Sequence, residues 1–220
     1  MIARDLISSS LIALHPNDDG EKAITLMEEF RTTHLPVVRN NFYLGIISER
    51  EILDWSNSKE FIDEHLEELI APSVIGSQHL FDIIEEVEKF SLSVIPVLDE
   101  KKKYLGAITN RKLLYTIAKS TAIQSIGSVI VLKMKPNDYS MSEIARIVES
   151  NNIKIVSSYI TSKLNVEYIE LTLKLNTLEL GPIIKSFERF DYSIIASYNQ
   201  KNNTEDLTER YESLMRFLNP

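Results

Sequence analysis

The side chains that could carry metal or acid–base chemistry are few in this sequence. Four histidines are present, and we consider two pairs with a carboxylate three residues on: His65 with Glu68, and His79 with Asp82. Residues at this spacing share one face of a helix, so each pair could offer two ligands to a cation. A protein zinc site uses three or four protein ligands, so neither pair predicts a metal centre. We expect these histidines to be surface or helix-capping residues.

The sequence also lacks cysteines and glycine-rich loops. The sequence has no cysteine, which excludes disulfides, thiol nucleophiles and thiolate metal sites. Its six glycines stand at least 21 residues apart, so the chain can form neither a G-x-G-x-x-G loop nor a Walker A loop nor a G-x-S-x-G elbow. We therefore expect no catalytic residues, no metal site and no required cofactor, and a protein that is not an enzyme.

The composition is that of a folded chain with an acidic surface. Of 220 residues, 44% are hydrophobic, and Asp plus Glu exceed Lys plus Arg by 32 to 24. The resulting net charge of −8 repels the phosphate backbone of nucleic acids. No apolar run approaches the ~18 residues of a membrane span, and the N-terminus lacks the apolar stretch of a signal peptide. We expect a cytoplasmic protein that binds neither nucleic acid nor membrane.

An internal repeat organises the first 120 residues. The segment 20–30 has the apolar stripe of an amphipathic helix, and the same stripe returns sixty residues later. The apolar positions have the same spacing in both copies: Ala23, Ile24, Met27 and Phe30 in the first, and Ile83, Ile84, Val87 and Phe90 in the second. The sequence therefore predicts two copies of one helix, each facing a core.

Two strands and a second helix follow that helix in each copy. The strands are short and rich in β-branched residues, and they keep their order: 35–38 and 43–48 in the first copy, 95–98 and 104–109 in the second. Ser48 and Thr109 then stand where the N-cap of the second helix is expected. With an opening strand, each copy has the order βαββα, and about 60 residues are few for an independent core. We expect the copies to pack as a pseudo-twofold pair.

This repeat resembles the tandem CBS-domain pair, or Bateman module, over residues 1–120. The matching segments contain the phrases Leu-Pro-Val-Val, Gly-Ile-Ile-Ser-Glu-Arg-Glu-Ile-Leu, Ile-Pro-Val-Leu and Gly-Ala-Ile-Thr-Asn-Arg-Lys-Leu-Leu: 35–38, 45–53, 95–98 and 106–114. The resemblance implies a first CBS repeat at 1–60 and a second at 61–122. It also implies clefts between the repeats for ligands that contain adenosine, with AMP, ADP, ATP and S-adenosylmethionine as candidates.

The ligand signature of the resembled family is a Ser or Thr with an Asp three residues later. Its hydroxyl meets phosphate, and its carboxylate accepts hydrogen bonds from the ribose diol. The first repeat offers Ser48 and Glu51, a carboxylate one methylene longer, whereas the second offers Thr109 and Lys112, and Lys cannot accept a hydrogen bond. The resemblance thus implies two unequal sites, with ribose at Glu51. The other implied nucleotide-binding residues are phosphate cations and base-flanking side chains: Arg50, Arg111 and Lys112, and His34, Leu35, Val94 and Ile95.

A purely structural interpretation of these residues stays open. Ser48 and Thr109 can act as helix caps, while Glu51 and Lys112 can be ordinary first-turn residues. Two function classes follow. One is a non-catalytic regulatory protein whose CBS pair binds an adenine nucleotide of the AMP, ADP or ATP class. The alternative is a ligand-free homodimerisation or scaffold protein with degenerate sites.

The last hundred residues follow a different plan. Four strands are predicted there: 128–134, 153–160, 166–173 and 194–198. Helices are expected to begin at Ser140, where Glu143 at the third position predicts a capping box, and at Gly181. The resulting order βαββαβ is that of the ferredoxin-like fold. We expect an α+β chain in which one domain at 123–200 follows the repeats.

Behind a CBS pair, a ferredoxin-like domain of this length resembles an ACT-like domain. The whole layout is similar to the acetoin-utilisation accessory (AcuB-like) family, and this resemblance rests on element order. ACT domains that bind amino acids usually have a glycine in the loop between the first strand and the first helix, and the loop 136–140 has none. The resemblance therefore implies a structural or dimerising domain. It would transmit nucleotide occupancy to a regulated protein, with a homodimer as the expected assembly.

The segment 201–220 completes the layout as a C-terminal amphipathic helix. Its predicted apolar face consists of Leu207, Tyr211, Leu214, Met215 and Leu218. Asn203 or Thr204 stands at the expected N-cap. We expect this helix to pack on its own chain, and contact with a partner chain is the alternative.

Overall fold

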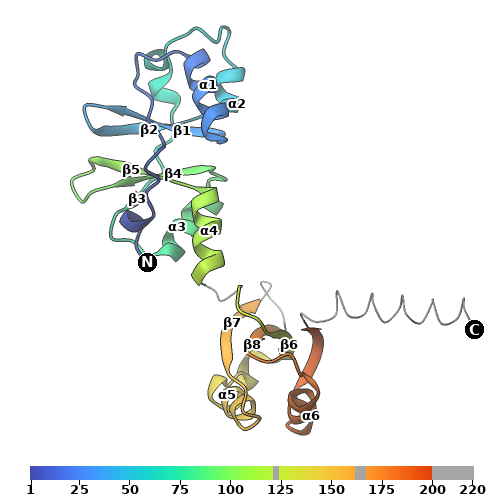
Figure 1. Cartoon of the computed structure of the whole chain (residues 1–220). Helices are drawn as coiled ribbons and strands as arrows, with labels where there is room; N and C mark the ends of the chain where they lie inside the picture. Colours follow the sequence, from blue (N-terminus) through green and yellow to red (C-terminus); the bar gives the residue numbers. More distant parts are fainter. Residues whose placement is uncertain (121–123, 162–166, 200–220) are drawn as a thin grey trace, which may run out of the picture. The chain divides into compact units, whose positions relative to one another are not determined.

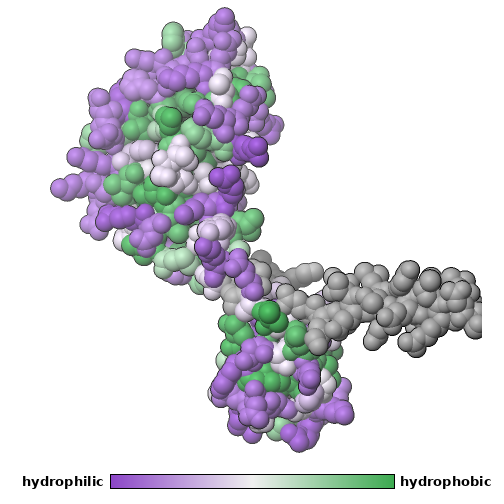
Figure 2. Space-filling view, in the orientation of Figure 1, coloured by the Kyte–Doolittle hydropathy of each residue, from purple (hydrophilic) through white to green (hydrophobic). Residues whose placement is uncertain are grey.

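The computed structural model describes residues 1–120, 124–161 and 167–199 (Figure 1). The predicted tail helix at 201–220 lies outside the described residues. The chain divides into two compact units, Met1–Ile117 and Ala118–Pro220. On the visible face of each unit, hydrophilic residues surround smaller hydrophobic areas (Figure 2). No helix within the described residues is long and apolar enough to cross a membrane.

The first 120 residues contain two repeats with nearly the same elements. In chain order these are η1 (Ala3–Leu6), α1 (Gly20–Phe30), β1 (His34–Arg39), β2 (Phe42–Ser48), α2 (Glu49–Leu53), η2 (Ile62–Glu68), β3 (Val74–Ile75), α3 (Leu80–Lys89), β4 (Val94–Leu98), β5 (Tyr104–Thr109) and α4 (Asn110–Ser120). β1–β2 and β4–β5 are antiparallel hairpins, and both have a bulge at the same place, after Val37 and after Val97. This shared register confirms the repeat that the sequence predicts.

The helices of the repeats follow from caps and apolar stripes. Asp19 accepts the Lys22 N–H at 2.8 Å at the start of α1, and α1 ends at Arg31 in the left-handed conformation. Ala23 and Met27 of α1 are buried in the first core, and Ile83 of α3 is buried in the second. The stripe predicted from the sequence is thus the face that each helix turns toward its hairpin.

Each repeat is completed by a short segment that lies next to the other repeat in the sequence. η1 comes at the very start of the chain, yet Ala3 and Leu6 belong to the core of the second repeat. η2 follows the predicted division at residue 60, yet Ile62 belongs to the core of the first repeat. The two cores therefore exchange segments, η1 for η2.

A glycine in each hairpin makes room for the exchanged segment. A Cβ atom at Gly45 would lie 2.6 Å from Cβ of Leu69, and one at Gly106 would lie 2.4 Å from Cγ2 of Ile7. Gly106 also has φ +147°, which L side chains rarely adopt. One backbone hydrogen bond of 2.9 Å ties each segment to its hairpin: Ile46 N–H to Ile70 O, and Ser8 N–H to Ala107 O.

Two elements differ in length between the repeats. The opening strand is the two-residue β3 in the second repeat, but in the first it is a single parallel bridge between Leu14 and Val37. The second helix has 11 residues in α4 and only 5 in α2. The repeats thus share a hairpin more closely than they share its flanks.

The second unit is a four-stranded antiparallel sheet with two helices. Its elements are β6 (Ser128–Met134), η3 (Pro136–Asp138), α5 (Met141–Glu149), β7 (Ile155–Thr161), β8 (Ile169–Leu175), α6 (Gly181–Arg189) and β9 (Ser193–Asn199). The strand order β7-β8-β6-β9 places the first and third strands of the unit in the centre. That topology is the ferredoxin-like fold, as the element order predicts.

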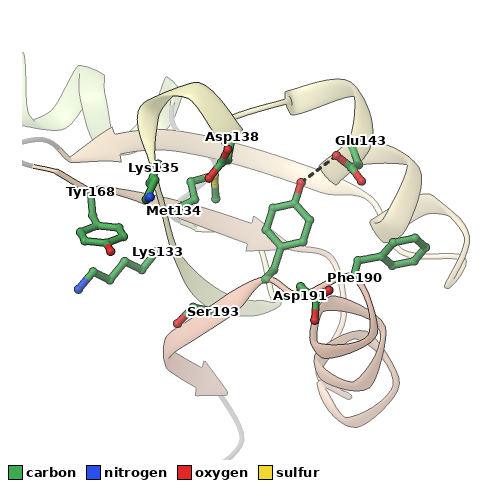
Figure 3. A pocket seen from close by; sticks show the side chains of 10 residues that line it. Lys133, Met134, Lys135, Asp138, Glu143, Tyr168, Phe190, Asp191 and Ser193 are labelled. Carbon is green, nitrogen blue, oxygen red and sulfur yellow. Dashed lines mark hydrogen bonds between the residues drawn. The ribbon is translucent and has the colours of Figure 1, made fainter.

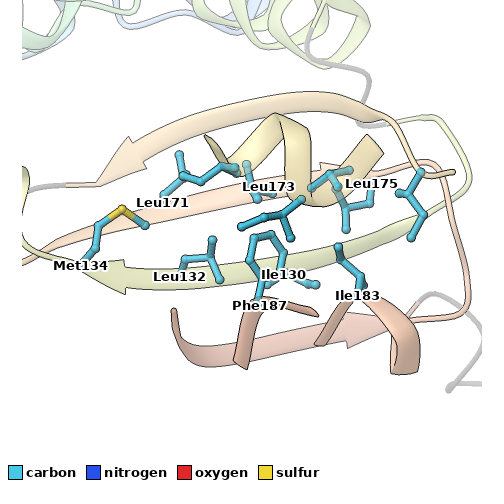
Figure 4. Packing of buried hydrophobic residues seen from close by; sticks show 12 residues of the cluster. Ile130, Leu132, Met134, Leu171, Leu173, Leu175, Ile183 and Phe187 are labelled. Carbon is cyan, nitrogen blue, oxygen red and sulfur yellow. The ribbon is translucent and has the colours of Figure 1, made fainter. Parts of the chain in front are cut away.

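Alternate residues of the two central strands form the core of this unit (Figure 4). Ile130 and Leu132 of β6 are fully buried, as are Leu171 and Leu173 of β8. Phe187 of α6 packs into this cluster. The period of two along each strand therefore gives one face covered by helices.

The capping box predicted at Ser140 is only half formed. The Ser140 hydroxyl oxygen accepts the Glu143 N–H at 3.4 Å. The Glu143 carboxylate does not return to the N-cap; it accepts the hydroxyl of Tyr192 at 3.3 Å. A partner distant in the sequence has replaced the local one.

Candidate functional site

Ser48 and Glu51 form a closed pair at the start of α2. Oε2 of Glu51 accepts the Ser48 N–H at 2.7 Å and the Ser48 hydroxyl at 2.6 Å, while Ser48 Oγ accepts the Glu51 N–H at 3.2 Å. This is a complete capping box. Because the box uses the hydroxyl proton and one carboxylate oxygen, the other carboxylate oxygen is what the pair can offer to a ribose.

Thr109 and Lys112 occupy the equivalent place at the start of α4. Thr109 Oγ1 accepts the Lys112 N–H at 3.2 Å, as an N-cap does. The Lys112 side chain has no acceptor, so the box cannot close. Within the described residues the Thr109 hydroxyl accepts this hydrogen bond and donates none. This hydroxyl can therefore donate to a ligand, which the Ser48 hydroxyl in its box does not.

Two adjoining cavities lie beside the N-terminus of α4, with volumes of about 350 and 430 Å³. Four residues line both: Ser8, Ser10, Thr109 and Arg111. The first cavity is also lined by Leu11, Glu29, Phe30, Arg31, Thr32, Ser93 and Asn110, and the second by Ile7, Ser9, Lys112 and Tyr115. Hydroxyls, cations and apolar side chains thus meet in one place.

The predicted ligand residues do not all come together. Thr109, Arg111 and Lys112 line these cavities, and Arg111 is exposed. Ser48, Arg50 and Glu51 of the first repeat line neither of the two. The three aliphatic residues predicted to flank a base are fully buried: Leu35, Val94 and Ile95. Since these residues have no exposed surface, a bound base could contact them only if neighbouring atoms moved.

His34 lies at the seam where β1 meets β4. Its Nδ1 accepts the Ser93 N–H at 3.4 Å and lies 3.1 Å from the Ser93 hydroxyl, which is in turn 2.6 Å from the Thr32 hydroxyl. Burial lowers the pKa of His34 below its usual 6.5, and the carboxylate of Glu51 opposes this shift. Thr32 and Ser93 also line the first cavity, so this hydrogen-bonded group connects the cavity wall to the Ser48 side.

Sequence patterns miss several of the cavity residues, above all Ser8, Ser9 and Ser10. These three follow η1, and the Ser8 N–H is bonded to the second repeat at Ala107 O. They reach the cavity because η1 packs on the distant repeat. A run of three serines was visible as a signal, but nothing in the order of elements places it beside Thr109.

Two further histidines have structural partners. His65 stacks on Trp55 with a centroid distance of 4.0 Å, and its Nε2 lies 2.9 Å from a Glu60 carboxylate oxygen. His79 caps α3 through a hydrogen bond from the Phe81 N–H at 3.3 Å. In the described part of the chain, no group of three or more His, Cys, Asp or Glu residues could hold a metal ion.

A third cavity, of about 400 Å³, opens at one end of the sheet in the second unit (Figure 3). Its lining side chains are Lys133, Met134, Lys135, Asp138, Glu143, Tyr168, Phe190, Asp191, Tyr192 and Ser193. Lys133 Nζ lies 4.6 Å from the centre of the Tyr168 ring. Burial, together with the neighbouring Glu143, raises the pKa of Tyr192. Charges of both signs face this cavity.

Comparison with known proteins finds a family match for the first repeat. Residues 3–58 match the CBS domain family. A curated homoserine O-acetyltransferase from Methanococcus vannielii is 28% identical over 126 residues, which make up 53% of this chain and 25% of that protein. The match therefore spans about a quarter of the length of this relative.

Two solved structures are similar to the chain at low identity. A CBS domain pair/ACT domain protein from Thermotoga maritima is 14% identical and covers 55% of this chain and 98% of its own, with a TM-score of 0.48. A CBS domain pair in complex with 5′-methylthioadenosine and S-adenosyl-L-methionine is 19% identical over the same shares, with a TM-score of 0.45. With TM-scores below 0.5, neither likeness adds to the assignment.

The assignment of the first unit rests on the family match and on the internal repeat. The matched residues include α1, β1, β2 and α2. The second repeat has these elements in the same order, with the same hairpin register and the same bulge. Residues 3–58 therefore match a CBS domain, and the second repeat of the first unit has the same elements in the same order.

Proposed function

We propose that this chain is a non-catalytic regulatory protein whose CBS pair binds an adenine nucleotide of the AMP, ADP or ATP class. The observation that carries the proposal is the pair of adjoining cavities beside α4. A nucleotide needs donors for phosphate, polar groups for ribose and an apolar wall for the base. Thr109, Arg111 and Phe30 are side chains of these three kinds in the cavity walls.

The second unit is proposed to pass the occupancy of the CBS pair to a regulated protein. Its ferredoxin-like topology is that of an ACT-like domain, and its own cavity lies at the end of the sheet that carries η3. Glycine is absent from the connection 136–140 between β6 and α5, which supports a role in contacts rather than in amino-acid binding. A sensor of adenine nucleotides would act in the cytoplasm, where these compounds are produced and consumed.

Thermal unfolding with AMP, ADP, ATP or S-adenosylmethionine tests the proposal. A ligand at 100 times its dissociation constant adds about 2.7 kcal/mol to the free energy of unfolding, and we expect the midpoint to rise by a few degrees. Trp55 is the only tryptophan of the chain and packs against the first core. Its fluorescence therefore reports on the unit that holds the proposed site.

A ligand-free homodimer or scaffold is the second candidate, and one observation favours it. Leu53 in α2 and Leu114 in α4 stand at equivalent positions of the two repeats and are 71% and 69% exposed. Leucines exposed in this way on both helices suit a contact with a second copy. A dimer whose unfolding midpoint does not move with any of the four compounds would support the scaffold and contradict the nucleotide sensor.

A further inference from the structure

The geometry points to a CBS pair that selects its ligand by negative charge and binds it on the Thr109 side alone; this inference rests on the proposed function. The expected ligand is a nucleoside polyphosphate held through its phosphates. S-Adenosylmethionine shares the adenosine but carries a sulfonium and has a net positive charge. We expect it to be rejected, although it is the same size class of ligand.

The Ser48 side, at the start of α2, and the Thr109 side, at the start of α4, differ in the sign of one charge. Glu51 and Lys112 occupy the same position in their helices, three residues after the capping hydroxyl. In the first repeat, the Glu51 carboxylate accepts the hydrogen bond that the Ser48 hydroxyl donates. In the second repeat, the ammonium group leaves the Thr109 hydroxyl as a donor. A phosphate would meet a carboxylate on one side and a cation plus a donor on the other.

The cavities on the Thr109 side carry an excess of positive charge. Arg31, Arg111 and Lys112 line them, against the single carboxylate of Glu29. Within the described residues none of the three cations takes part in an ion pair. Cations that form no ion pair with a protein carboxylate are available to phosphate oxygens, with which Arg forms strong bidentate hydrogen bonds. The positive end of α4 adds to the same field.

Hydroxyl groups line the same cavities as these cations. Ser8, Ser9 and Ser10 come from the segment that follows η1. Each hydroxyl can donate to a phosphate oxygen or accept from a ribose hydroxyl. The segment is fixed on the second repeat by the hydrogen bond from Ser8 N–H to Ala107 O. The serines are therefore held in place before a ligand arrives.

On the Ser48 side, Arg50 stands at the position equivalent to Arg111, but carboxylates flank it. Glu49 and Glu51 both stand in the first turn of α2. His34 pairs with Ser48 across the hairpin, and its burial favours the neutral imidazole. Arg50 is exposed between the two carboxylates in sequence. This side is expected to repel a polyphosphate, so one ligand should bind per chain.

Isothermal titration of the full chain without magnesium tests the selectivity. The titrants are ATP, AMP, adenosine, S-adenosylmethionine and inorganic tripolyphosphate. We expect ATP to bind more tightly than AMP and AMP more tightly than adenosine, each by about tenfold. S-Adenosylmethionine should bind no better than adenosine, and the stoichiometry should be one.

Matched variants locate the site. Arg111→Gln combined with Lys112→Gln should weaken ATP binding by at least tenfold and leave adenosine binding within twofold. The control exchanges the equivalent residues of the first repeat, Arg50→Gln and Glu51→Gln, and should leave ATP affinity within twofold. Circular dichroism on each variant confirms that loss of binding is not loss of fold.

The outcomes separate this inference from the proposed function. Equal affinity for ATP, adenosine and S-adenosylmethionine would overturn charge selection but keep the nucleotide sensor. Two ATP molecules per chain, or a larger loss in the Arg50 and Glu51 control, would overturn the one-sided site. If tripolyphosphate binds as tightly as ATP, charge selection holds but nucleoside recognition, and with it the proposed function, fails. Absence of binding by every titrant would overturn both.

Discussion

Two tyrosines at equivalent positions show how one hydrogen bond can distinguish the repeats. The Tyr43 hydroxyl donates to Pro72 O at 2.9 Å. The Tyr104 hydroxyl is buried and has no partner within the described residues. Burial raises the pKa of both hydroxyls above the usual 10, so both are protonated at neutral pH. The same chemical group is therefore satisfied in one repeat and unsatisfied in the other.

Replacing each tyrosine by phenylalanine should give opposite results. Tyr43→Phe leaves the Pro72 carbonyl without its donor and should lower the free energy of unfolding by about 1 kcal/mol. Tyr104→Phe removes an unsatisfied hydroxyl and should be neutral or stabilising. Urea denaturation of both variants measures the difference. A loss for Tyr104→Phe as large as that for Tyr43→Phe would show that Tyr104 has a partner after all.

His34 should make the stability of the first unit depend on pH. Its pKa is lowered by burial in the folded state, so the unfolded chain binds the proton more readily. The stabilisation is complete above the unfolded pKa of about 6.5 and is lost as the pH falls below it toward the folded value. We expect the native chain to lose more stability than His34→Gln between pH 7.5 and 5.5, as followed by Trp55 fluorescence during urea denaturation.

Identical losses in the native chain and His34→Gln over this interval would contradict the assignment to His34. Carboxylates elsewhere titrate in the same way in both proteins, so the difference between the two curves isolates the imidazole. Among the described residues, Glu51 is the charged group whose field acts on the imidazole, and it favours protonation. Adding Glu51→Gln should therefore widen the pH effect of His34.

At the scale of elements, the contact between each exchanged segment and its hairpin depends on a glycine. Gly106→Ala would place a Cβ atom 2.4 Å from Ile7 Cγ2 on a backbone with φ +147°. We expect it to lower the free energy of unfolding by about 1–3 kcal/mol. Gly181→Ala serves as the control, because apart from its chain neighbours and its own helix backbone no described residue lies within 4 Å of its Cβ position. Thermal unfolding that is equal for both variants would show that the segment shifts without cost.

The elements themselves were predictable wherever local chemistry decides them. The helix 20–30 and the strand 128–134 agree with α1 and β6 at both ends, since an apolar stripe and a short apolar run rich in β-branched residues are local signals. The box at Ser140 was half wrong because Tyr192, 49 residues from Glu143 along the chain, takes its carboxylate. Such a partner is chosen by tertiary packing, which no local pattern records.

At the scale of the whole molecule, the candidate site also combines residues that the sequence could name with residues that only tertiary packing places. Thr109, Arg111 and Lys112 were named through the resemblance to CBS domains, which carry a ligand signature at these positions. Their ligating role remains a prediction. Ser8 to Ser10 could not be found, since their place beside Thr109 depends on the exchange of η1 for η2. The division at residue 60 was likewise drawn from periodicity, and packing crosses it.

The exchange of η1 for η2 also bears on how the pair assembles. If the two repeats were separate molecules, the core of each would need η1 or η2 from a second molecule. The folded fraction would then rise with protein concentration. Because the repeats are joined in one chain, the contacts of η1 and η2 with their cores are intramolecular, at an effective concentration of order millimolar for a short linker. The pair can therefore form at any dilution, and neither half reaches its native core until both are present. Folding of the first unit is thus expected to be a single step shared by both repeats.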